Sequence, residues 1–155
     1  MRRHLIVLLF LILIGACSTT RIVETPPIHP PNGVTKSQVE SAIKAAVSRF
    51  KGAWAIEEIQ QDTIIAGLRV RNHYMKLGIY YNERTISSRI ISSINLKQDD
   101  RSIHKRALFW QTRLETAIHQ EVARLSISSR SDLNITKNAV SVIQSEVVHE
   151  IIKSR

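Results

Sequence analysis

The chain has 155 residues, with 22 basic against 13 acidic side chains and a formal net charge of +9. Its single cysteine excludes a disulfide framework within the chain, so the fold depends on its hydrophobic core. The length suits one domain of ordinary size, and the basic balance indicates either anionic partners or simply a soluble basic surface.

The first 16 residues have the composition of a secretory signal peptide. Two arginines precede an apolar run over residues 5–14, which is shorter than the roughly 20 residues that a membrane-spanning helix needs. An aliphatic residue and two small residues, Ile14, Gly15 and Ala16, then lead directly to Cys17. The alternative, a signal peptide that ends near a cysteine by chance, is disfavoured because Cys17 is the only cysteine of the chain.

The pattern that ends at Cys17 resembles the bacterial lipobox. This resemblance implies that residues 1–16 are cleaved off, that the Cys17 sulfur receives a diacylglycerol and that the new amino group is acylated. Three acyl chains are enough for stable anchoring to a membrane. Ser18 follows the cysteine where an aspartate would imply the inner membrane, so the outer membrane and its periplasmic face are expected. The mature chain would keep 20 basic residues against 13 acidic ones, because only Arg2 and Arg3 are lost.

Residues 17–34 are predicted to be the lipidated cysteine followed by a proline-rich tether. All four prolines of the chain lie within residues 26–31, and no sustained apolar period accompanies them. In a polyproline-type conformation, at roughly 3 Å per residue, this stretch would hold the domain up to about 50 Å from the lipid.

Residues 35–128 are predicted to form an α+β domain that begins with a helix. Thr35 and Gln38 have the capping-box spacing, apolar residues recur at helical intervals up to Phe50, and Gly52 is placed to end the helix. Alternating apolar and polar residues then predict strands over residues 54–58, 64–73, 75–81 and 86–91. One face of each strand is apolar, which is typical of an antiparallel sheet covered by helices on one side.

Two further helices are predicted. The first spans residues 104–125, with an apolar stripe of Ala107, Trp110, Leu114, Ala117, Ile118 and Leu125. The second belongs to a C-terminal helical extension, residues 129–155, whose weaker pattern over 136–153 either docks on the domain or faces a partner. This order predicts a two-layer α+β sandwich of a helix, a three- or four-stranded antiparallel meander and a helix, plus a C-terminal helix.

Residues 54–118 carry an ordered set of short motifs. The set begins with a tryptophan at Trp54 and an acidic residue at Glu57, followed by I-x-A at 64–66 and a basic residue with x-H at 71–73. It continues with I-x-Y at 79–81, S-x-N-L at 93–96 and W-x-x-x-L at 110–114. This set is similar to that of a group of small, uncharacterised bacterial lipoproteins, although Ala107 and Leu108 stand where that group has tyrosine and asparagine. The resemblance implies an envelope lipoprotein and implies no activity.

A candidate binding surface lies on the polar face of the predicted sheet. Arg69, Arg71 and His73 have strand spacing and are expected to project from one face, where Gly67 and Gly78 would leave the backbone bare. A basic, partly aromatic patch of this kind suits a phosphate, a carboxylate or a glycan, and it would be completed by Lys76, Tyr80 and Arg89. The alternative is the solvated outer face of a one-sided sheet.

The sequence contains no motif typical of an enzyme active site. HExxH, GxSxG and glycine-rich phosphate loops are absent, and no catalytic residue, metal ligand set or cofactor is predicted. Glu57 and Glu58 are adjacent on a strand and are expected to face opposite ways. Trp54 and Trp110 are expected to pack together between sheet and helix, with exposed sugar-stacking platforms as the alternative.

Two functions are consistent with these features. The first is an outer-membrane-anchored periplasmic lipoprotein that acts as a non-catalytic binding or assembly module for an envelope protein or an anionic envelope polymer, with no role in binding nucleic acid. The alternative is a ligand-binding or hydrolytic protein that acts on cell-wall or lipid fragments through the face that carries His73. A cleft that joins His73 to a carboxylate such as Glu57 would favour the alternative, and a flat, open face would count against it.

Overall fold

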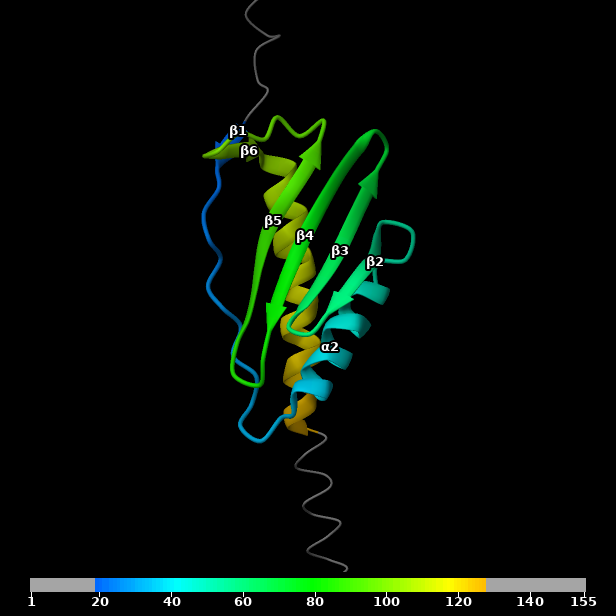
Figure 1. Ribbon diagram of the computed structural model, residues 1–155, viewed down its shortest axis with the longest axis vertical. Coiled ribbons are helices and arrows are strands. Elements are labelled where there is room, and N and C mark those ends of the chain that lie inside the picture. The colour runs from blue at the N-terminus through cyan, green and yellow to red at the C-terminus, as the bar shows by residue number, and fades with distance from the viewer. Residues whose placement is uncertain (1–18, 128–155) are drawn as a thin grey trace, which may run out of the picture.

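The computed structural model describes residues 19–127, which form a two-layer α+β sandwich (Figure 1). The sheet has the strand order β2-β3-β4-β5, with β2 at Trp54–Gln60, β3 at Thr63–Val70, β4 at His73–Tyr81 and β5 at Ile86–Ile94. Helix α2 (Lys36–Ser48) and a helix over residues 105–127, called the long helix below, lie on the same face of the sheet. The predicted fold class is therefore confirmed. The predicted helix within 129–155 and the lipobox at Cys17 lie outside the described residues.

Helix α2 begins where the capping pattern predicts. The Thr35 side chain accepts a hydrogen bond from the Gln38 backbone N–H, and the Gln38 side chain accepts one from the Thr35 backbone N–H at 2.8 Å. These reciprocal bonds satisfy two backbone donors that a helix start leaves free. The helix ends at Ser48, earlier than predicted, and Gly52 adopts a φ of +83° in the turn that follows.

The core lies between the sheet and the two helices. Alternate residues of β3 and β4 point into it and are buried, as their spacing predicts: Ile64, Ala66, Leu68, Met75, Leu77, Ile79 and Tyr81. From the long helix, Ala107, Leu114, Ala117, Ile118 and Val122 are buried against them. The opposite face of the sheet, called the open face below, is not covered by any element within residues 19–127 (Figure 1).

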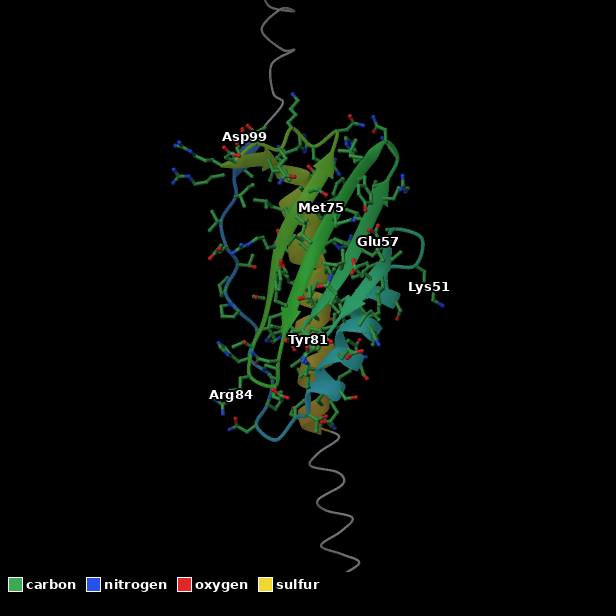
Figure 2. The ribbon with its side chains drawn as sticks, in the orientation of Figure 1. Lys51, Glu57, Met75, Tyr81, Arg84 and Asp99 are labelled. Atoms are coloured by element: carbon green, nitrogen blue, oxygen red, sulfur yellow. The ribbon has the colours of Figure 1, made fainter. Side chains whose placement is uncertain are left out.

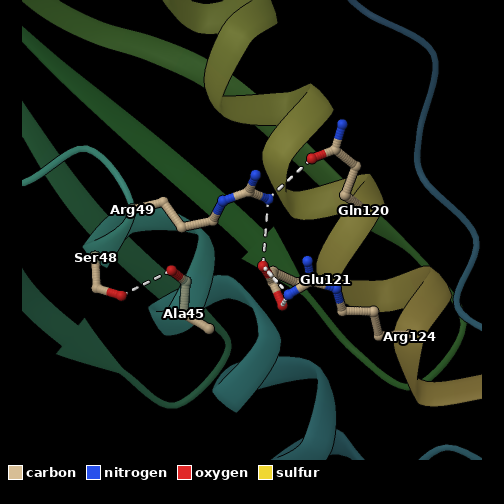
Figure 3. A network of polar contacts seen from close by, with 6 residues as sticks. All are labelled: Ala45, Ser48, Arg49, Gln120, Glu121 and Arg124. Atoms are coloured by element: carbon tan, nitrogen blue, oxygen red, sulfur yellow. Dashed lines mark hydrogen bonds and ion pairs between the residues drawn. The ribbon is translucent and has the colours of Figure 1, made fainter.

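Polar contacts join the two helices outside the core (Figure 3). The Arg49 guanidinium donates to Gln120 Oε1 at 2.9 Å and lies 3.3 Å from Glu121 Oε1, to which Arg124 also donates at 3.0 Å. Exposed ion pairs of this kind contribute little, so burial of the apolar stripes is what holds the helices to the sheet. No helix within residues 19–127 combines the length and the apolar character needed to cross a membrane.

Two of the strands contain a β-bulge. The register shifts between Ile56 and Glu58 in β2, and it shifts in β5 opposite the step from Lys76 to Leu77, which makes Glu57 and Ile91 the extra residues. An extra residue changes which side of the sheet the following side chains face. Glu58 pairs with Ile65 on the open face, and Glu57 contacts Tyr74 and Gly67 on that same face, so the prediction that the two glutamates face opposite ways is wrong.

The segment before α2 does not stand off the domain as the tether prediction requires. β1 (Thr19–Arg21) pairs with β6 (Ser102–His104), Ile28 exchanges two 2.8 Å backbone hydrogen bonds with Ile86, and Val34 is buried. Residues 19–34, called the N-terminal segment below, therefore run along the outer edge of β5 (Figure 1). The cause is that an edge strand offers unpaired backbone groups, and that Ile22 and Ile28 pack against the core. The predicted reach of about 50 Å is wrong for these residues.

Candidate functional site

The six predicted binding residues do not form one patch. The register places Arg69, Lys76, Tyr80 and Arg89 on the open face, because their paired neighbours there are Tyr74, Gly67, Thr63 and Gly78. Arg71 lies in the turn between β3 and β4, and His73 points toward the helices. The prediction of a single face for Arg69, Arg71 and His73 is therefore wrong.

A two-residue turn explains the difference. Val70 pairs with His73, so Arg71 and Asn72 alone connect β3 to β4. Arg71 has a φ of 54°, in the left-handed region that a tight turn between strands requires. The chain reverses at this point, whereas the predicted first strand continues to residue 73. Arg69 consequently faces the open side and His73 the other.

His73 is held in place by two neighbours on the helix side. Its Nδ1–H donates to the Asn95 carbonyl at 2.9 Å, and its ring centroid lies 6.1 Å from that of Trp110 on the long helix. Trp54 is buried in the core at the start of β2, and no ring contact joins it to Trp110 within residues 19–127. The predicted pairing of the two tryptophans is therefore replaced by a pairing of Trp110 with His73.

Glu57 lies on the open face on the side of the edge strand β2 (Figure 2). Its carboxylate accepts from the Tyr74 hydroxyl at 2.7 and 2.9 Å and lies 3.4 Å from Lys76 Nζ. It covers Gly67, where a Cβ would lie 1.9 Å from Glu57 Oε1. Burial, and then the hydrogen bond to Glu57, raise the pKa of Tyr74. The backbone at Gly67 is thus buried under a side chain, contrary to the prediction that it is bare.

The other glycine of the open face is covered as well. A Cβ at Gly78 would lie 3.1 Å from both the Ile91 Cδ1 and the Tyr80 hydroxyl. Ile91 and Tyr80 remain 44% and 42% exposed, and Ile94, further along β5, is 57% exposed. Apolar surface is therefore concentrated over β4 and β5, on the half of the open face away from Glu57.

A hollow of about 370 Å³ borders this apolar surface. It lies between β5 and the N-terminal segment and is lined by Glu24, Thr25, Tyr80, Ser87, Ser88 and Arg89. Arg89 forms an ion pair with Glu24 at 3.0 Å across it. Below the hollow, Glu115 Oε1 accepts from Thr25 and Ser88, each at 2.6 Å, which ties the segment to the long helix.

The charges of the open face are largely paired. Lys76 is matched by Glu57 and Arg89 by Glu24, while the Arg69 guanidinium lies 5.3 Å above the Tyr74 ring. The face is therefore mixed in charge, in place of the basic patch that the sequence predicts. The positions of Glu57 and Ile91 on this face could not be predicted, because nothing in the residue pattern indicates a bulge. The position of Glu24 could not be predicted either, because a free tether would not contact the sheet.

His73 and Glu57 are not placed for joint acid–base chemistry. His73 faces the helices and Glu57 faces the open side, so the sheet separates them. No cluster of three or more His, Cys, Asp or Glu side chains that could hold a metal ion occurs in the part of the chain that the structure describes.

No protein family, curated protein or solved structure matches this chain.

Proposed function

We propose that this chain is a lipoprotein of the outer membrane, anchored at Cys17, that binds an envelope protein through the open face of its sheet. The observation that carries this proposal is the uncovered apolar surface of Tyr80, Ile91 and Ile94. A protein–protein contact combines an apolar centre, enriched in aromatic side chains, with a polar rim. Arg69, Lys76 and Glu57 would supply that rim on the β3–β4 side.

A protein partner fits this face better than an anionic polymer does. A polymer of phosphate or carboxylate groups is bound by cations that are free to meet it. Here Lys76 and Arg89 are each engaged by a carboxylate of the chain itself, and the exposed surface beside them is apolar. Binding of a polymer through this face would have to break both ion pairs.

The hydrolytic alternative is disfavoured by the position of His73. That alternative needs the imidazole and a carboxylate to face one ligand in a cleft. The Nδ1–H of His73 donates to the Asn95 carbonyl, and Glu57, the carboxylate that this alternative named, is on the other face of the sheet. The binding module is therefore the function that we retain.

Site-specific photo-crosslinking in cells tests the partner surface. A photoreactive residue at Ile94 is expected to capture one defined envelope protein, whereas the same residue at Phe109, which is 52% exposed on the helix side, is not. The substitution Tyr80→Asp should abolish the product formed at Ile94. Equal capture from both positions, or capture that survives Tyr80→Asp, would refute the open face as the binding surface.

The anchor is tested separately. The protein extracted from membranes should begin at Cys17 and carry the mass of three acyl chains, and Cys17→Ala should lose both the acyl chains and the membrane fraction. An unmodified Cys17 in the wild-type protein would refute the lipoprotein assignment.

A further inference from the structure

The β1–β6 end gathers basic side chains that form no ion pair with another residue of the described part of the chain. Six exposed basic residues lie there, from β1, the β3–β4 turn, the β5–β6 connection and the start of the long helix: Arg21, Arg71, Lys97, Arg101, Lys105 and Arg106. None of the six forms an ion pair within residues 19–127, and the acidic side chains of this end are Asp99 and Asp100.

Hydrogen bonds and strand pairing connect these elements into one surface. Arg21 is paired with Ser102, and the Ile22 N–H donates to the Arg101 carbonyl at 2.9 Å. Asn95 donates from its side chain to the Asn72 carbonyl at 2.7 Å, which joins the β3–β4 turn to the end of β5. Figure 2 shows Asp99 at this end and Arg84 at the opposite end of the sheet.

Asp99 organises the β5–β6 connection and does not neutralise the cations around it. Its carboxylate accepts from the backbone N–H groups of Arg101 and Ser102 at 2.8 and 2.7 Å and from the Ser102 hydroxyl at 2.8 Å. The backbone hydrogen bond from Arg101 is the main cause that lowers the pKa of Asp99. With this carboxylate engaged in the turn, the guanidinium of Arg101 is left exposed.

The anchoring residue is close to the same end. Cys17 precedes Thr19 by two residues, which span at most about 7 Å when fully extended. Thr19 is paired with His104, so the chain is fixed to the domain from that point on. A lipid on Cys17 would therefore place the β1–β6 end at the membrane surface, where basic residues are attracted to anionic headgroups.

We infer that the β1–β6 end is a membrane-contacting surface that binds the anionic phospholipid headgroups of the leaflet that holds the anchor. This inference rests on the proposed acylation of Cys17. It fixes the orientation of the domain: the sheet stands upright on the leaflet, and its open face is presented sideways to a partner. The long helix spans about 35 Å at 1.5 Å per residue, so its far end lies well away from the headgroups.

Hydrogen exchange of the acylated protein on vesicles tests the inference. One set of vesicles contains phosphatidylethanolamine with phosphatidylglycerol, and the other has phosphatidylcholine in place of the anionic lipid. Amides of residues 95–101 should exchange at least about tenfold more slowly on the first set, since each basic residue raises the binding constant for an anionic surface about fivefold. The protection should vanish in Arg101→Glu/Lys105→Glu. It should persist in Lys51→Glu/Arg84→Glu, which changes the net charge equally at sites away from this end.

Different results would overturn the membrane-contacting surface and the acylation of Cys17 on which it rests. Acylated protein whose residues 95–101 exchange equally on both kinds of vesicle, or whose protection is lost in both double variants, would overturn the membrane-contacting surface and leave the anchor intact. Protein extracted from membranes with an unmodified Cys17 would overturn the anchor and this inference together.

Discussion

The contact between Tyr81 and Glu40 joins helix α2 to the end of β4, and its loss should change both the stability of the protein and the dependence of that stability on pH. Tyr81 is 3% exposed, and its hydroxyl donates to Glu40 Oε2 at 2.9 Å. We expect Tyr81→Phe to lower the free energy of unfolding by about 1 kcal/mol near neutral pH, since a hydrogen bond to a charged group is lost but the freed carboxylate can be hydrated.

The sign of this effect should reverse in alkali. Burial, followed by the hydrogen bond to Glu40, raises the pKa of Tyr81 to about 12, against about 10 for an unfolded tyrosine. The neutral phenol is favoured in the folded state, so its stabilisation is complete below pH 10 and is lost as the pH rises toward 12. At pH 11 the wild type should have lost about 1.4 kcal/mol through this group, which is more than the hydrogen bond contributes.

Urea denaturation at pH 9 and at about pH 11 measures this reversal in the relative stability of the wild type and Tyr81→Phe. The wild type should be the more stable protein at the lower pH, and Tyr81→Phe should equal or exceed it at the higher one. Tyr80→Phe is the matched control, because Tyr80 lies on the open face and the Tyr81–Glu40 bond remains. If Tyr81→Phe lost as much stability as the wild type over this range, the reasoning would be refuted.

Three further predictions concern the core, the helix start and the open face. Leu114→Ala should lower the free energy of unfolding by about 2–5 kcal/mol in urea, because Leu114 is fully buried, whereas His119→Ala on the exposed side of the same helix should change it by less than about 0.5 kcal/mol. Thr35→Ala should cost about 1 kcal/mol by the same assay and Thr35→Ser almost nothing, since serine restores the cap; equal losses would contradict the capping role. Glu57→Gln and Gly67→Ala should both lower the pKa of Tyr74 toward its ordinary value in an ultraviolet titration, the first by removing the charge and the second by displacing it; an unchanged titration in Glu57→Gln would show that the contact is not formed.

The core and the element types could be predicted because they depend on periodicity. Leu68 and Leu77 are each flanked by a glycine and a charged residue, and this alternation predicts strands with one buried face. The capping pair at Thr35 and Gln38 fixed the start of α2 in the same local way.

The candidate site could not be predicted to the same extent, because it depends on which face of the sheet each side chain occupies, and turn lengths and bulges decide that. The two-residue turn at Arg71 and Asn72 contains no glycine or proline, so the residue pattern predicts that the strand continues and places His73 on the wrong face. The bulges at Glu57 and Ile91 have no signature in the residue pattern, yet they decide which side chains cover Gly67 and Gly78.

The N-terminal segment shows a third limit of the sequence. Prolines and the absence of an apolar period indicate a chain without regular secondary structure, and residues 22–31 contain no helix and a single isolated bridge, at Ile28. That pattern alone does not distinguish a free tether from a segment that docks on a sheet edge. The deciding contacts, between Ile28 and Ile86 and between Thr25 and Glu115, are long-range and appear only in the folded structure.

Fluorescence quenching from the bilayer tests the central claim most directly. Acylated protein labelled at Gln98→Cys, at the β1–β6 end, and at Glu83→Cys, in the β4–β5 turn of the opposite end, is placed on vesicles of phosphatidylethanolamine and phosphatidylglycerol that contain a quencher in the headgroup region. If the anchored domain stands on its basic end, quenching should be strong at residue 98 and weak at residue 83. Equal quenching at the two positions, or stronger quenching at residue 83, would contradict it.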